Sequence, residues 1–198
     1  MATMRTLSLR DFVSVLQNGD PYPYYAVLLY PPLNGLNAKL HQYVESHWPY
    51  LNSLTGDACL LFALERGGQP IEDFRPEDVY AIARHLGAEV DKVPCLVFIT
   101  DPKNQRQTLI QPLKPLFPGD DQVADNTFTE FFQHLQAILD KCATSAAPAD
   151  RLTCLQSSFN QEFVLPARSR RAVSIAVNVA GTIDQVLKPI TALLNALH

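Results

Sequence analysis

The sequence lacks the cysteine and histidine motifs by which thiol enzymes and metal sites are usually recognised. Four cysteines form no CxxC pair and no cluster with histidine at zinc-ligand spacing. His41 and His47 stand six residues apart rather than the four of a helical metal pair. We therefore expect no structural zinc and no bound cofactor.

Long apolar runs are also missing. No segment reaches the ~18 uninterrupted apolar residues of a membrane span, and the first residues, MATMRTLSLRDF, lack the apolar core of a secretory signal. The cysteines are therefore expected as reduced thiols in a cytoplasmic protein.

Charge is sparse, with 18% charged and 47% hydrophobic residues and a net charge of −4. This composition is typical of a folded soluble domain, and an acidic chain is not expected to bind nucleic acid. Basic residues outnumber acidic ones in residues 151–198, whereas acidic residues dominate residues 1–150. The C-terminal part thus complements the front portion or an acidic partner.

What the sequence does contain is an alternation of helical and strand patterns. Apolar runs predict buried strands in YYAVLLYPP and ACLLFAL, and VPCLVFIT with QRQTLIQPL predicts a hairpin. Amphipathic spacing predicts helices at about 8–18, 34–56, 75–87 and 127–143. This order predicts an α/β fold with a mixed sheet flanked by helices in residues 1–147. The linker ATSAAPAD marks a boundary near residue 147, and residues 148–198 are predicted to form a helical extension.

The Val93-Pro94 step directly precedes a run of strand-forming residues. With the element order, it resembles the thioredoxin fold over about residues 5–143. The resemblance implies a cis peptide bond at Pro94, since an X–Pro bond is where cis is accessible. It also exposes a departure: the segment YPPLNGLNAKL, where that family carries its CxxC, has no cysteine. The resemblance therefore implies the scaffold without dithiol exchange.

Cys95, directly after Pro94, has two interpretations. It could be a solitary reactive thiol, because the cis-proline loop lies beside the active-site helix in thioredoxin-like proteins. Alternatively it packs in the core, as free cysteine commonly does. We predict packing for Cys95 and also for Cys59, Cys142 and Cys154, which lie in an apolar run or on apolar helix faces.

The last segment has an apolar stripe at alternating steps of three and four residues, which predicts a long amphipathic helix. The helix face that packs against the core or a partner comprises Ala176, Val179, Ile183, Val186, Leu187, Ile190, Leu193, Leu194 and Leu197. This helix could fold back on its own domain, dock on an identical or different chain, or lie on a membrane. Its polar side carries few basic residues, so membrane contact is the weakest of these interpretations.

Arg168, Arg170 and Arg171 form a basic cluster before that helix. It is either a solvated linker or a contact for an acidic partner or lipid head groups.

These features lead to a non-catalytic protein-interaction or scaffolding module as the leading functional hypothesis. Its partner would be another protein or a second copy, bound through the C-terminal helix. The alternatives are a thiol-dependent enzyme using Cys95 alone and a membrane-acting protein that inserts its last helix.

Overall fold

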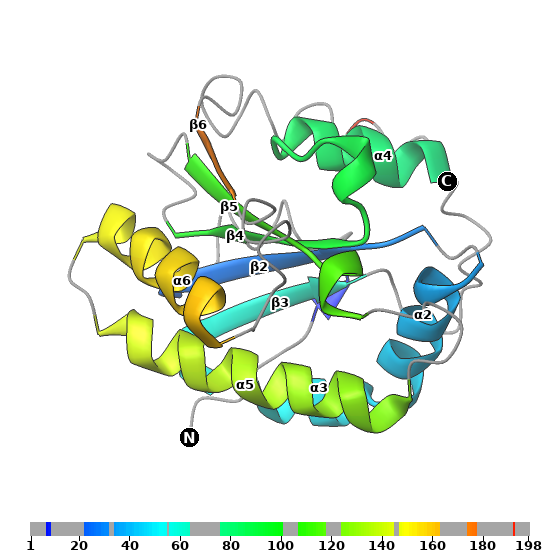
Figure 1. Ribbon diagram of the computed structural model, residues 1–198, viewed down its shortest axis with the longest axis horizontal. Coiled ribbons are helices and arrows are strands. Elements are labelled where there is room, and N and C mark those ends of the chain that lie inside the picture. Colours follow the sequence, from blue (N-terminus) through cyan, green and yellow to red (C-terminus); the bar gives the residue numbers. More distant parts are fainter. Residues whose placement is uncertain are drawn as a thin grey trace.

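A six-stranded mixed sheet forms the centre of the molecule (Figure 1). The computed structural model describes residues 7–8, 22–31, 34–54, 56–63, 76–100, 107–117, 124–144, 147–162, 174–177 and 192. The strands are β1 (Leu7–Ser8), β2 (Tyr24–Leu29), β3 (Cys59–Ala63), β4 (Cys95–Ile99), β5 (Gln107–Pro112) and β6 (Ser174–Val177). Across the sheet they follow the order β1-β3-β2-β4-β5-β6.

The pairing changes direction in the middle of the sheet. Strands β1 and β2 both pair parallel with β3. Strand β4 is antiparallel to β2, β5 to β4, and β6 to β5. The predicted α/β class and the predicted hairpin of β4 and β5 are therefore confirmed.

The central strands consist of apolar residues because both of their faces are covered. Every residue of β2, β3 and β4 is buried. Alternation of polar and apolar residues would be expected only if one face met solvent. The continuous apolar runs in the sequence were therefore a sound signal for these strands.

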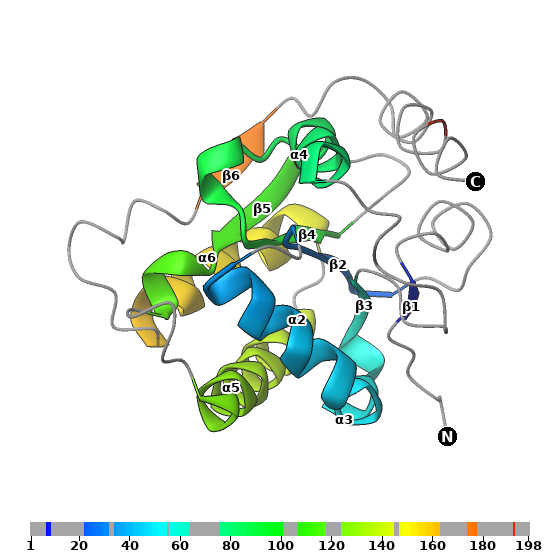
Figure 2. The ribbon, with the colours of Figure 1, turned by 90° about the vertical axis from the view of Figure 1, so that its right-hand side faces the viewer.

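Helices cover both sides of the sheet, with α4 on one side and α2, α3, α5 and α6 on the other (Figure 2). They are α2 (Leu36–Ser46), α3 (Trp48–Leu54), α4 (Pro76–His85), α5 (Asp125–Ala143) and α6 (Pro148–Glu162). Short 3-10 turns are η2 (Gly56–Ala58), η4 (Val90–Lys92) and η5 (Lys114–Leu116). None of the helices in these described ranges combines the length and apolar character that crossing a bilayer requires.

Helix α5 follows from its spacing of apolar side chains. Phe128, Leu135 and Ile138 step by about two turns and one turn, and all are buried. Asp125 lies in the first turn and Lys141 in the last, where each charge is favourable to the helix dipole. The helix predicted at about 34–56 is divided in two, because α2 ends at Ser46 and Pro49 sits in the first turn of α3.

Helix α6 shares the core of the sheet. Leu152, Leu155 and Phe159 are fully buried in the same apolar cluster as the central strands, and the Phe159 ring lies 5.7 Å from that of Phe98 in β4. The boundary expected near residue 147 coincides with the turn between α5 and α6. Side chains on both sides of this turn thus contribute to one core.

The predicted C-terminal helix is wrong at its start. Residues 174–177 form strand β6 on the edge of β5, so Ala176 belongs to a strand. An open strand edge offers backbone hydrogen bonds that a helix cannot use, and these favour the extended form. Ala192 is helical and exposed.

Several sequence expectations fall outside the described residues. Ser8, at the start of the first helix expected at about 8–18, lies in β1. Outside the described residues are the rest of that helix, the cluster Arg168, Arg170 and Arg171, and the remaining stripe of Val179, Ile183, Val186, Leu187, Ile190, Leu193, Leu194 and Leu197.

Candidate functional site

All four cysteine sulfurs occupy structural positions. Cys142 near the end of α5 and Cys154 in α6 form a disulfide, with their Cα atoms 5.6 Å apart. The expectation of reduced, separately packed thiols is wrong for this pair. The physical reason is that the turn after α5 folds α6 back against it, which brings two cysteines on apolar faces within bonding distance.

The two free thiols are buried in the sheet. Burial raises the pKa of the Cys95 thiol to about 12, while the positive charge of Lys92 acts in the opposite direction. Burial also raises the pKa of Cys59, and a hydrogen bond with the backbone of Ala26 opposes it. Since the thiolate is the nucleophile, burial acts against the reactivity of both thiols.

The step before β4 places Cys95 inside the sheet. The Val93–Pro94 peptide bond is cis, as the sequence led us to expect. The backbone N–H of Leu113 donates to the carbonyl of Pro94 at 2.8 Å. Cys95 then pairs with Leu29 of β2 and Pro112 of β5. It is therefore flanked by strands on both sides, with a fully buried side chain.

A group of polar side chains lies where β2 ends and α2 begins, and we call it the α2 polar cluster. It comprises Tyr30, Asn37, His41 and Glu45. The Tyr30 ring lies 5.9 Å from the His41 ring, and His41 Nε2 lies 3.6 Å from Glu45 Oε2. Tyr30 Oη, Asn37 Oδ1 and His41 Nδ1 are buried without a hydrogen-bond partner in the described part of the chain.

Burial favours the neutral forms of the cluster's phenol and imidazole. It raises the pKa of Tyr30 well above its usual value, and the Glu45 charge acts in the same direction. It lowers the pKa of His41, with the Glu45 charge opposing this effect. A neutral phenol and a neutral imidazole can donate or accept hydrogen bonds, but neither is a charged nucleophile.

The cluster has unused capacity to hold a polar group. Buried polar atoms are normally hydrogen-bonded, so three in one place indicate capacity for further hydrogen bonds. In the described ranges, no group of three or more His, Cys, Asp or Glu side chains is placed to hold a metal ion. The sequence did carry a signal that we missed: Asn37, His41 and Glu45 follow one another at four-residue steps beside the apolar stripe of α2.

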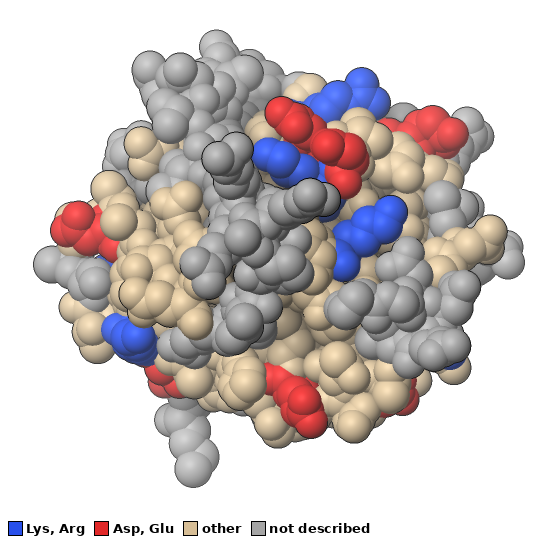
Figure 3. All heavy atoms as spheres, viewed as in Figure 1, with Lys and Arg blue, Asp and Glu red and all other residues tan. Residues whose placement is uncertain are grey.

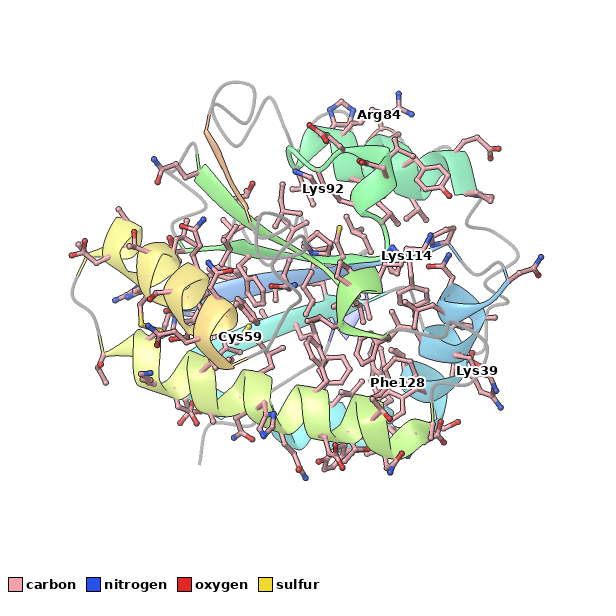
Figure 4. All side chains as sticks on the ribbon, in the orientation of Figure 1. Lys39, Cys59, Arg84, Lys92, Lys114 and Phe128 are labelled. Carbon is pink, nitrogen blue, oxygen red and sulfur yellow. A yellow bond between two sulfur atoms is a disulfide. The ribbon has the colours of Figure 1, made fainter. Side chains whose placement is uncertain are left out.

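The surface near Pro94 is mixed in charge and contains one prominent apolar side chain. Val90 in η4 is 42% exposed, the one large apolar residue of the described chain that is exposed. Arg84, Lys92 and Lys114 come from α4, η4 and η5 on this side (Figure 4). Basic and acidic atoms interleave there in the space-filling view (Figure 3), and Lys92 lies 4.0 Å from Glu89.

Compared with family models, with curated proteins and with solved structures, the chain matches none of them.

Proposed function

We propose that the chain has a thioredoxin-like architecture and acts as a non-catalytic protein-interaction or scaffolding module. The order β3-β2-β4-β5, with one parallel and two antiparallel pairings, supports the architecture. The cis bond at Pro94 directly before β4 supports it further.

The observation that carries the proposal is the placement of the sulfur atoms. Cys59 and Cys95 are at most 1% exposed, and Cys142 is bonded to Cys154. Redox-active thioredoxin-like proteins carry a thiol at the end of the first core strand. In this chain the buried α2 polar cluster lies at that place. This arrangement opposes the single-cysteine enzyme and favours binding as the function.

The turn that leads into Pro94 is the proposed contact surface. Val90 is exposed there between Glu89 and Asp91, which are exposed as well. Interfaces commonly place an apolar contact inside a polar rim. A protein partner with a small apolar patch fits this surface better than nucleic acid does, because charges of both signs surround Val90.

The disulfide bears on the proposed location. Thiols are kept reduced in the cytosol, whereas disulfides persist in oxidising compartments. The Cys142–Cys154 bond thus weighs against the expected cytoplasmic location. Counting free thiols in protein purified without reductant tests this point: two per chain are expected if the bond forms in the cell.

Native-state alkylation tests the absence of thiol chemistry. We expect iodoacetamide to leave Cys59 and Cys95 unmodified in buffer and to modify both after unfolding in guanidinium, as read by mass spectrometry. Rapid native labelling of Cys95 would contradict the proposal and favour the enzyme.

Affinity capture with the full chain as bait, followed by reconstitution with purified partner, tests the binding role. Truncation at residue 147 is unsuitable, because it removes three core side chains of α6. We expect Val90→Asp to weaken the complex by about tenfold, the effect of losing a modest interface contact. The exposed Thr153→Ala is the matched control. A chain that forms no complex, with itself or with another protein, would refute the proposal.

A further inference from the structure

Strand β5 is held in place without help from β6. Its Thr108 hydroxyl donates to the carbonyl of Leu86, just after α4, at 2.9 Å. Leu109 and Ile110 are fully buried, and β4 pairs with the opposite edge of β5. If β6 leaves, β5 therefore remains formed, with its outer backbone groups exposed as a template for another strand.

Strand β6 is attached in a way that allows it to leave. It lies at the edge of the sheet, and among the described strands it is the last in the chain, so none of them pairs beyond it. It is joined to α6 through residues 163–173, which can span roughly 35 Å when extended. Its four residues make only a short ladder with β5.

Backbone hydrogen bonds pair β6 with β5, so an identical strand from another chain can replace β6. In the antiparallel register, Gln107 faces Val177 and Ile110 faces Ser174. A second copy of this chain carries the same strand, so its length and register match the β5 edge. A different protein would have to present a matching strand by chance. Exchange in both directions yields a closed twofold dimer.

We propose that β5 is a strand-accepting edge and that two copies of this chain assemble by exchanging Ser174–Val177. The exchange names a second copy as the partner in the proposed interaction role. Its biological purpose rests on that role. Within one chain, β6 competes for the β5 edge at a fixed effective concentration, whereas a strand from a second chain competes at the protein concentration. The proportion of exchanged dimer therefore rises with protein concentration.

Cross-linking between two variants, each with one cysteine added to the native four, tests the exchange directly. One chain carries Gln107→Cys and the other Val177→Cys, so a disulfide between these positions can form only between chains. Directly opposite residues in an antiparallel pair have the Cα spacing that a disulfide needs. The mixture is oxidised mildly, and the products are separated without reductant and mapped by mass spectrometry.

We expect a covalent heterodimer linked at these positions, in at least tenfold greater yield than when Val177→Cys is replaced by Thr153→Cys on exposed α6. Its yield should rise with total protein concentration. The variant Ala176→Pro, added to the Val177→Cys chain, should reduce the yield several-fold, because proline is disfavoured within a paired strand.

The chain carrying both cysteines completes the test. If it closes its own disulfide while the mixed single variants give no heterodimer, β6 stays in cis and the proposal is overturned. If neither forms the link, β6 does not occupy the β5 edge and the proposal also fails. Neither result depends on thiol labelling or on the Val90 surface, so failure here is distinguishable from failure of the proposed binding role.

Discussion

On the side of the sheet that carries four helices, the α6 end and the α2 end bury polar and apolar groups differently. At the α6 end, Leu152 and Phe159 fill the core and a disulfide joins Cys142 to Cys154. At the α2 end, Tyr30 and His41 bury polar atoms that have no hydrogen-bond partner in the described chain. Helix α6 has one such atom, Asn160 Oδ1, whereas the α2 end has three, Tyr30 Oη, Asn37 Oδ1 and His41 Nδ1. Each unsatisfied buried polar atom costs about 1–3 kcal/mol, so the α2 end bears the larger cost in stability.

This difference assigns separate roles to the two ends. The α6 end resembles an ordinary core with an added covalent link, and we expect it to dominate the free energy of unfolding. The α2 end keeps hydrogen-bonding capacity at some expense of stability, as is common where proteins bind ligands or partners. Four measurements test this contrast, and they are given in order of decreasing expected effect.

The largest effect is expected from Phe159→Ala. The variant removes a fully buried ring that packs beside Phe98, so the free energy of unfolding should fall by about 3–5 kcal/mol. Urea titration followed by circular dichroism measures this change. Gln161→Ala, on the exposed side of the same helix, should change stability by less than about 0.5 kcal/mol. Equal effects of the two variants would show that α6 does not belong to the core.

Removing the disulfide should have the next largest effect. Its cysteines are 12 residues apart in sequence, and closing a loop of this size constrains the unfolded chain by about 3 kcal/mol. Replacing both Cys142 and Cys154 with alanine should therefore lower the urea midpoint. Dithiothreitol should lower the midpoint of the unsubstituted protein similarly and leave the double variant unchanged. Insensitivity of the unsubstituted protein to the reductant would contradict a stabilising bond.

Two tyrosine variants should change stability in opposite directions. Tyr30→Phe deletes a buried hydroxyl without a partner, so stability should rise by about 1 kcal/mol. Tyr43→Phe deletes a hydroxyl that lies 3.0 Å from Thr129 Oγ1, so stability should fall by about 1 kcal/mol. Chemical denaturation of the two variants side by side measures both changes. A loss on Tyr30→Phe would mean that this hydroxyl has a partner in solution, which would remove the contrast between the two ends.

The smallest effect concerns pH. Burial lowers the pKa of His41 below its usual value of 6.5, so the unfolded chain binds this proton more readily than the folded one. His41 therefore has no effect above about pH 7, and stability falls as the pH drops through 6.5 toward the folded-state pKa. Denaturation midpoints between pH 7.5 and 5 should decline less steeply for His41→Gln.

Nuclear magnetic resonance titration of the His41 ring gives an independent check of that sign. A pKa above 6.5 would mean that the negative charge of Glu45 outweighs burial.

Local patterns in the sequence were sufficient for most of the fold. The continuous apolar run of β3 and the stepping of Phe128, Leu135 and Ile138 in α5 each specify one element, because burial imposes its period directly on the residue order. End signals such as Pro76, with Glu77 and Asp78 in the first turn of α4, locate that helix closely.

Elements and contacts that depend on distant partners could not be predicted in this way. The steps of three and four residues that begin at Ala176 suit a helix, yet residues 174–177 pair with β5 because its edge is available. Cys142 and Cys154 each lie on an apolar stripe, and their spacing in the sequence does not indicate a disulfide bond. Tyr30 ends an apolar run, so its neighbour His41 becomes apparent only once α2 packs beside β2.

Residue order alone is enough to predict the α/β class, the strands of the central sheet, the helices α4 and α5, and the absence of a CxxC motif. Each of these follows from residue type and local period. Only the tertiary structure decided that Cys142 and Cys154 bond, that residues 174–177 extend the sheet, and that Tyr30 and His41 meet in a buried cluster. These three depend on which segments pack side by side, and packing is set by the burial and backbone pairing of the whole chain rather than by neighbours in sequence.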